Sequence, residues 1–166
     1  WMQREGGLAY DADGAAAAKG SVQQSIVDTY LQLPFFAQPA PKSLDRGDFD
    51  LSAVTGLNLN DGARTLAALA AEAVFAARKQ MPDMPKLWIL CGGGRKNPHI
   101  ADDLRRLAAA EGGEVLAAEE VGLDGDATEA EAWAYLAVRS ARALPLTWPT
   151  TTGCRQPTSG GVLVQP

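Results

Sequence analysis

The chain has 166 residues, 46% of them hydrophobic, which is enough for one domain with its own core. Its net charge is −5 at pH 7, and its 15 Lys and Arg residues are scattered along the sequence. Nucleic acids and anionic membranes bind clustered basic side chains, so the composition argues against both as main partners.

The sequence favours a cytoplasmic protein. No apolar stretch approaches the roughly 18–20 residues of a membrane helix, and the start of the chain lacks the apolar core of a signal peptide. Cys91 and Cys154 lie far apart and fit no zinc spacing, so we expect no metal site. One disulfide between them is the alternative, but reduced thiols are expected in a cytoplasmic protein. Because the chain begins with Trp1 rather than Met, we expect a piece of a longer protein.

The first half is predicted to be helical. A turn over residues 10–14 leads into four alanines and a short helix that ends at Gly20. Ser21 is expected to cap a second helix, which ends at Pro34 and whose apolar residues recur every three or four positions: Val22, Ile26, Tyr30 and Leu33. Residues 35–60 show no periodicity and predict a long loop, a type of segment that is often functional or mobile.

A long alanine-rich helix is predicted over residues 61–80. Pro82 and Pro85 follow it and prevent its continuation. The expected inward face consists of Leu66, Leu69, Ala73 and Ala77.

A β-α-β unit follows. Residues 86–91 predict an apolar strand, and three glycines follow it at residues 92–94. Asn97-Pro98 predicts the start of a helix, which is expected to end at residue 111. Residues 114–118 predict a second strand, which should pair parallel to the first.

The last predicted helix starts at Thr128, with Glu131 three residues later as in a capping box. Its expected inward residues are Ala132, Tyr135, Leu136 and Val138. Residues 145–166 are rich in Pro, Thr and Gly and are expected to wrap over the surface, with residues 161–164 as a weak third strand. Two or three strands form too small a sheet to bury the apolar faces of four helices. We therefore predict an incomplete sheet whose other strands lie before Trp1.

The three glycines between strand and helix are the best candidate for a binding site. Glycine lets a ligand approach the backbone closely, and the N-terminus of the following helix suits phosphate. The alternative is a plain turn, since strand-glycine-helix turns without ligands occur throughout α/β proteins. No Walker A sequence is present, and Asn97 stands where a dinucleotide fingerprint needs its third glycine.

The other polar candidates are weaker. Asp11-Ala12-Asp13-Gly14 does not fit the register of a calcium loop and is better explained as a turn with an Asp cap. His99 has no partner histidine and is expected on the surface. Glu129 lies among acidic residues that the helix dipole alone explains, yet it also lies where α/β proteins bind ligands.

Taken together, the motifs resemble the anhydro-N-acetylmuramic acid kinase family over nearly the whole chain. The ordered matches are residues 10–15, 41–43, 91–94 with 97–98, 125–130 with 134–137, and 149–153. The resemblance implies an α/β fold: residues 1–166 would be the partial C-terminal domain of an actin-like (ribonuclease H-like) two-domain kinase.

The same resemblance implies the chemistry. ATP with Mg²⁺ would phosphorylate O6 of 1,6-anhydro-N-acetylmuramic acid as its anhydro ring is opened by water, giving N-acetylmuramic acid 6-phosphate in cell-wall recycling. Gly92, Gly93, Gly94 and Asn97 would contact the nucleotide, and Glu129 would face the sugar. A homodimer is also implied.

Two departures from the family pattern bear on activity. The family often has Lys-Ser-Thr-Gly-Arg where this chain has residues 42–46 as Lys-Ser-Leu-Asp-Arg. The segment expected to carry the general base would lie upstream of Trp1, so no catalytic residue is expected within this chain, which alone should be inactive.

Two other functions remain open. One is an actin-fold nucleotide-binding sensor or partner module without enzymatic activity, since fold does not decide function. The other is a Rossmann-type oxidoreductase, against which Asn97 argues.

Overall fold

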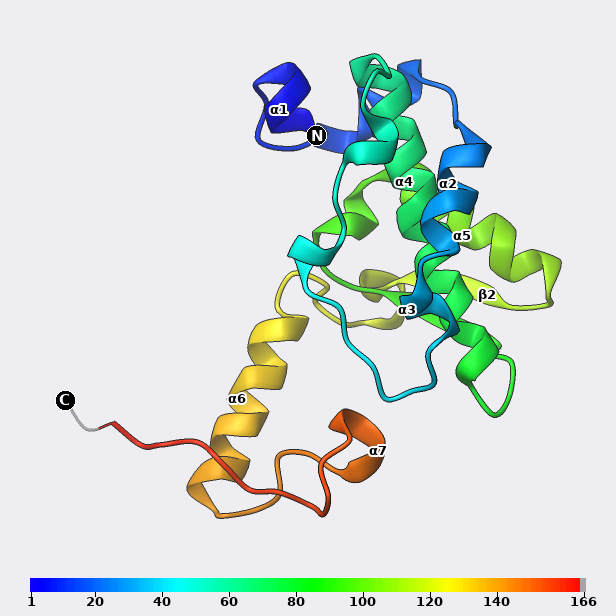
Figure 1. Ribbon diagram of the computed structural model, residues 1–166. Coiled ribbons are helices and arrows are strands. Elements are labelled where there is room, and N and C mark those ends of the chain that lie inside the picture. The colour runs from blue at the N-terminus through cyan, green and yellow to red at the C-terminus, as the bar shows by residue number, and fades with distance from the viewer. Residues whose placement is uncertain (165–166) are drawn as a thin grey trace.

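The protein is mixed α/β, with helices packed on one face of a two-stranded parallel sheet (Figure 1). The computed structural model describes residues 1–164. Its elements in chain order are α1 (Met2–Gly6), η1 (Ala12–Gly14), η2 (Ala17–Lys19), α2 (Gln24–Leu31), α3 (Pro34–Ala37), η3 (Arg46–Asp48), η4 (Ser52–Val54), α4 (Leu59–Ala76), η5 (Ala77–Gln80), β1 (Leu87–Leu90), η6 (Gly93–Lys96), α5 (Pro98–Ala110), β2 (Glu114–Ala117), η7 (Ala118–Val121), α6 (Thr128–Ala141) and α7 (Pro149–Thr152).

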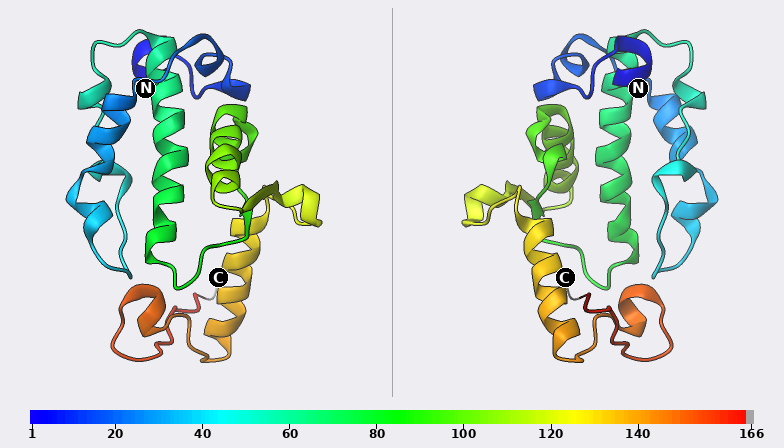
Figure 2. Two further views of the ribbon diagram at one scale, coloured as in Figure 1. Left: turned by 90° about the vertical axis from the view of Figure 1, so that its right-hand side faces the viewer. Right: turned by 90° about the vertical axis from the view of Figure 1, so that its left-hand side faces the viewer.

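Helix α4 is the central element, with the segment around α2 on one side and α5 on the other (Figure 2). The helix predicted over residues 61–80 is confirmed, with η5 as its last turn. Its predicted inward face is only partly right, because Leu69 is buried but Ala77 is exposed. Two neighbours bury α4 from different sides, so its buried residues do not form one stripe.

The segment before α4 is more ordered than its sequence predicts. Helix α2 begins at Gln24, and Ser21 does not cap it; the amide of Ser21 donates instead to the Asp61 carboxylate at 2.7 Å. The predicted loop contains α3, η3 and η4, and Val54 within it is fully buried beside Val27. Residues 35–60 are therefore not an irregular loop throughout, and part of the segment packs against the core beside α2.

The two predicted strands and their parallel pairing are confirmed. Leu87 of β1 aligns with Glu114 of β2, and Leu90 aligns with Ala117. Trp88 and Val115 face α4 and α5, where they pack with Phe75 in a core. On the opposite face Leu87 and Ile89 are 46% and 41% exposed. Parallel sheets normally have both faces covered, and within residues 1–164 only one face of this sheet is.

Helix α6 extends away from the helical layer (Figures 1 and 2). The predicted inward packing of Ala132, Tyr135 and Val138 is wrong, since all three are exposed, and Leu136 is only half-buried. No residue of α6 is buried, because only the segment after the helix lies against it. Its apolar pattern predicted a partner that residues 1–164 do not supply.

The segment after α6 turns back along that helix, as the red trace in Figure 1 shows. A single antiparallel bridge joins Thr147 and Thr158. The weak third strand predicted at residues 161–164 is not formed, and residues 165–166 of the predicted surface tail lie outside the described part. Across residues 1–164, no helix has the length and apolar character to cross a membrane.

Candidate functional site

The glycine turn after β1 is open. Gly92 has φ 74° and ψ 177°, a backbone conformation that is essentially restricted to glycine. A Cβ atom added at Gly92, Gly93 or Gly94 would meet no other atom within 4 Å. A ligand could therefore approach this stretch of backbone without displacing a side chain.

Helix α5 begins shortly after the turn in the sequence. The Asn97 side-chain oxygen accepts a hydrogen bond from the His99 amide at 3.0 Å, and Pro98 occupies the first helical position. Both features confirm the predicted helix start. A helix N-terminus carries partial positive charge and suits an anionic group.

Arg95 forms hydrogen bonds to the glycine turn and to two neighbouring segments. Its side chain is only 7% exposed, and one terminal nitrogen donates to the Gly92 carbonyl and to the Asp126 carboxylate, both at 2.8 Å. The rest of the guanidinium group donates to the Glu119 carboxylate, with Nε at 3.1 Å from Oε1. These partners come from three separate segments, so Arg95 joins the turn to η7 and to the loop before α6.

The loop before α6 also meets the turn at the backbone. The Gly92 amide donates to the Gly125 carbonyl at 2.8 Å. Gly125 is buried, and a Cβ atom there would overlap the Arg95 side chain at Nε. Only glycine fits over the arginine at this position unless the arginine moves.

The charges in this cluster shift each other's titration. Hydrogen bonds from Arg95 and then Lys96 hold the pKa of the Asp126 carboxyl well below its usual range. Arg95 likewise lowers the pKa of Glu119, and Asp126 and Glu119 together raise the pKa of Arg95. All three groups are therefore charged at neutral pH.

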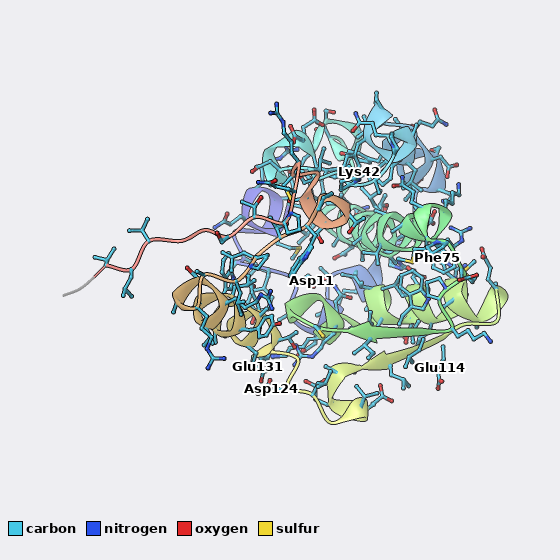
Figure 3. The ribbon with its side chains drawn as sticks, turned by 90° about the horizontal axis from the view of Figure 1, so that it is seen from below. Asp11, Lys42, Phe75, Glu114, Asp124 and Glu131 are labelled. Carbon is cyan, nitrogen blue, oxygen red and sulfur yellow. The ribbon has the colours of Figure 1, made fainter. Side chains whose placement is uncertain are left out.

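Glu129 lies in the first turn of α6, with its side chain exposed. It follows the loop that contacts the glycine turn. Figure 3 labels Asp124 in this loop and Glu131 in the first turn of the helix. The predicted cap of this helix is wrong, because the N-cap residue is Ala127 and no side chain caps the helix. Asp124 forms its hydrogen bonds within the preceding loop. The Asp124 carboxylate accepts from the amides of Asp126 and Ala127, while the Thr128 hydroxyl donates to the Asp124 carbonyl.

The turn at residues 10–14 packs against the start of α5. The Asp11 carboxylate accepts from the amides of Ala16 and Ala17 at 2.7 and 3.0 Å, which confirms the predicted Asp cap. The His99 ring lies close to Gly14, where an added Cβ atom would be 2.8 Å from it. His99 is therefore half-buried, whereas the sequence predicted a solvated surface position. Asp11 and Asn97 both line a hollow of about 370 Å³ at this junction.

The Pro41-Lys42-Ser43 motif lies across α4 from the sheet (Figure 3). The Lys42 ammonium group donates to the carbonyls of Phe35 and Phe36 at 2.7 and 3.2 Å and lies 4.5 Å from the centre of the Phe35 ring. These contacts close the end of α3, so Lys42 has a structural role in its own segment.

Residues 1–164 contain no cluster of three acidic, histidine or cysteine side chains that could hold a metal ion. The acidic groups nearest the turn, Glu119 and Asp126, are already bound to Arg95, and Asp126 also to Lys96 at 2.7 Å. These residues do not form a Mg²⁺ site by themselves. In phosphoryl transfer Mg²⁺ is bound by the nucleotide phosphates together with one or two carboxylates. Cys91 and Cys154 are free, as predicted.

The sequence predicted the glycines and Asn97 as candidate site residues, but it did not indicate Arg95, Gly125 or Asp126, which the structure places around them. The arginine follows the glycines directly, which was a usable signal. Its partners, however, are 24 and 31 residues away in the sequence, and no local pattern pairs them.

Comparison with known proteins gives one family. The model described as anhydro-N-acetylmuramic acid kinase matches residues 1–166. A curated protein of that name from Agrobacterium fabrum is 50% identical over 165 residues, covering 99% of this chain and 44% of the relative. One from Brucella canis is 50% identical over 166 residues, covering 100% and 44%, and one from Rhodospirillum rubrum is 52% identical over 162 residues, covering 97% and 42%. The chain thus spans less than half the length of these relatives.

Proposed function

The chain belongs to the anhydro-N-acetylmuramic acid kinase family, and we propose that it forms part of an ATP-dependent kinase for 1,6-anhydro-N-acetylmuramic acid. The observation that carries the proposal is the open glycine turn between β1 and α5. Its backbone can be approached from solvent, and it leads into a helix N-terminus that suits a phosphate group.

In this proposal Gly92, Gly93, Gly94 and Asn97 contact ATP. Glu129, on the helix that begins next to the turn, faces the sugar. Mg²⁺ bound with ATP would supply charge neutralisation at the transferred phosphoryl group. Positioning and electrostatic stabilisation supply most of the catalysis in such transfers, and the part of these residues is to hold the two substrates in register.

The proposed reaction is hydrolytic opening of the 1,6-anhydro ring together with phosphorylation at O6. Water adds at C1 and gives up a proton to the general base, the bond between C1 and the bridging O6 breaks, and the freed O6 receives the phosphoryl group of ATP. The products are N-acetylmuramic acid 6-phosphate and ADP, which fits a role in cell-wall recycling. An ATP-dependent reaction and two free thiols suit the cytoplasm.

The general base that activates water is assigned to a part of the protein outside this chain. Within residues 1–164, Glu119 and Asp126 are occupied by Arg95, and Glu129 is assigned to the sugar. The complete protein is proposed to have an actin-like two-domain fold, with residues 1–166 as most of the second domain, and to act as a homodimer. The chain by itself is proposed to be inactive.

The experiment is to supply the complete protein with Mg-ATP and the anhydro-sugar in water labelled with ¹⁸O. The proposal expects one ADP for each sugar phosphate and one ¹⁸O atom at C1 of the product. ATP binding with no sugar-dependent ADP would instead favour a nucleotide-binding module. The isolated 166-residue chain should release no ADP above background, and sustained turnover by it would contradict the assignment of the base elsewhere.

A further inference from the structure

Arg95 is more deeply buried than the other arginines whose salt bridges the structure describes. Its side chain is 7% exposed, compared with 18% for Arg64 and 22% for Arg78. Its carboxylate partners, Glu119 and Asp126, are 51% and 57% exposed. The buried member of this cluster is thus the cation, and it binds the Gly92 carbonyl of the glycine turn.

The turn is bound at both polar groups of its first residue. The Gly92 carbonyl accepts from Arg95, and the Gly92 amide donates to the Gly125 carbonyl, each at 2.8 Å. Gly125 in turn lies against the arginine side chain, with no room for a Cβ atom. Gly92, Arg95 and Gly125 therefore form a closed set of contacts.

The consequence reaches α6. Arg95 also binds Asp126, the residue after Gly125, and α6 begins at Thr128. Along the chain, Gly93 and Gly94 come directly after Gly92, which Arg95 binds. Glu129 comes three residues after Asp126, which Arg95 also binds. The same guanidinium group thereby sets the position of both segments.

We propose that Arg95 is a positioning residue for the kinase reaction, fixing the nucleotide-binding glycine turn and the sugar-facing start of α6 in one geometry. The inference rests on the proposed function, because it takes the turn as the ATP site and Glu129 as a sugar contact. Arg95 itself touches neither substrate in this account. Its planar group spreads its donors over three nitrogens in a fixed geometry, so it can bind Glu119 through two nitrogens while a third binds the Gly92 carbonyl and Asp126, which the single nitrogen of a lysine cannot do.

The test compares Arg95→Gln, Arg95→Lys and a matched control in the complete protein. The control is Arg105→Gln, which removes a 45% exposed arginine bonded to Asp102 on the outer side of α5. A displacement of about 1 Å at a reacting centre costs on the order of 10²-fold in rate. Arg95→Gln should therefore raise the KM for ATP at least about tenfold and lower kcat, Arg95→Lys should be intermediate, and Arg105→Gln should stay within about twofold.

The KM for ATP separates positioning from simple loss of folded protein, because an unfolded fraction lowers apparent kcat without changing KM. Each variant is normalised to its folded fraction by circular dichroism. A second route is Gly125→Ala, which should raise the KM in the Arg95 protein but much less in the Arg95→Gln protein, where the added methyl group has room.

Two results would overturn the inference: Arg95→Gln within twofold of wild type in both constants, or an equal change in Arg105→Gln. The proposed function is judged separately by the wild-type protein. If the wild type binds ATP but does not turn over, the dissociation constants for ATP are compared instead. A higher constant for Arg95→Gln than for wild type supports the inference, and equal constants overturn it. If the wild type does not bind ATP, both ideas fail.

Discussion

The Gly92 amide donates a hydrogen bond to the carbonyl of Gly125, 2.8 Å away and in a different loop. This bond places the glycine turn that follows β1 next to the loop that precedes α6. Two segments with candidate roles, one for nucleotide and one for sugar, are therefore neighbours in space. The contact gives the candidate site a physical basis that the separate motifs do not have.

Gly93→Ala and Gly92→Ala should have different effects. Gly92 has a positive φ of 74°, so alanine there is expected to cost about 1–3 kcal/mol of stability. At Gly93 a Cβ atom meets nothing within 4 Å, so alanine should change stability by less than about 0.5 kcal/mol. If a nucleotide lies against this backbone, Gly93→Ala should still weaken ATP binding about tenfold or more.

Thermal unfolding and calorimetric titration with ATP check this pair of variants. Unchanged ATP affinity in a folded Gly93→Ala protein would mean that the turn is only a chain reversal.

Glu129→Gln should lower kcat/KM for the anhydro-sugar with little change in thermal stability. Its side chain is exposed in the first turn of α6, so removing its charge disturbs little packing. A lost charge-assisted hydrogen bond to a substrate corresponds to about 1.5–3 kcal/mol, or roughly ten- to a hundredfold. Steady-state kinetics at saturating ATP provide the measurement.

Glu131→Gln is the matched control for that variant, because Glu131 is also exposed in the first turn of the helix. Similar losses in both variants would point to the helix dipole as the cause and remove the specific role from Glu129.

Asp103→Ala should be strongly destabilising. The Arg64 guanidinium donates to both oxygens of Asp103, at 2.8 and 3.1 Å, and so ties α4 to α5. The Asp103 side chain is only 10% exposed, and Arg64 would be left largely buried without its partner. Because Arg64 keeps some solvent, we expect a loss of about 2–3 kcal/mol, at or below the range for fully buried pairs.

The midpoint of thermal unfolding measures this effect, with Asp102→Ala as the control. Asp102 is one residue away and 70% exposed, so its change should stay under about 0.5 kcal/mol. Equal shifts for the two variants would show that the Arg64 pair contributes no more than a surface ion pair.

Asp126 should make the cluster around the turn sensitive to acid. Its folded-state pKa lies below the ordinary value of 3.8, mainly because of Arg95. A lowered carboxyl pKa stabilises the fold above the unfolded value, and this stabilisation is lost as the pH falls through the folded value. The difference in melting temperature between wild type and Asp126→Asn should therefore be constant from neutral pH to about pH 5 and shrink below pH 3.8.

Melting curves from pH 7 to pH 2.5 test this at low and at high salt. Salt should reduce the difference, because Asp126 is 57% exposed. A difference that grows as the pH falls would contradict the sign of the linkage.

The sequence predicted elements whose signals are local. An apolar run gave each strand, and Asn97-Pro98 predicted the start of α5 because cap and helix are adjacent in the chain. Thr128 does not cap α6, because it is the first residue of the helix and its hydroxyl donates to the Asp124 carbonyl. Tyr135 and Val138 carry an apolar pattern, but they are 61% and 52% exposed because nothing within residues 1–164 packs on them.

The candidate site was predictable only in part, for a similar reason. The glycines at 92–94 carry a local signal for close backbone approach, whereas the Arg95 cluster depends on how η7 and the loop at 122–127 return to the turn. Such long-range pairing is set by the packing of the whole fold, and no spacing rule contains it.

The central claim is that the glycine turn binds the nucleotide, and hydrogen exchange tests it most directly. Amide exchange is measured on the complete protein with and without a non-hydrolysable ATP analogue, while calorimetry confirms that the analogue is bound. The account predicts slower exchange in peptides covering residues 91–97 and no change in residues 150–160. Bound analogue with unchanged exchange at residues 91–97 would contradict it.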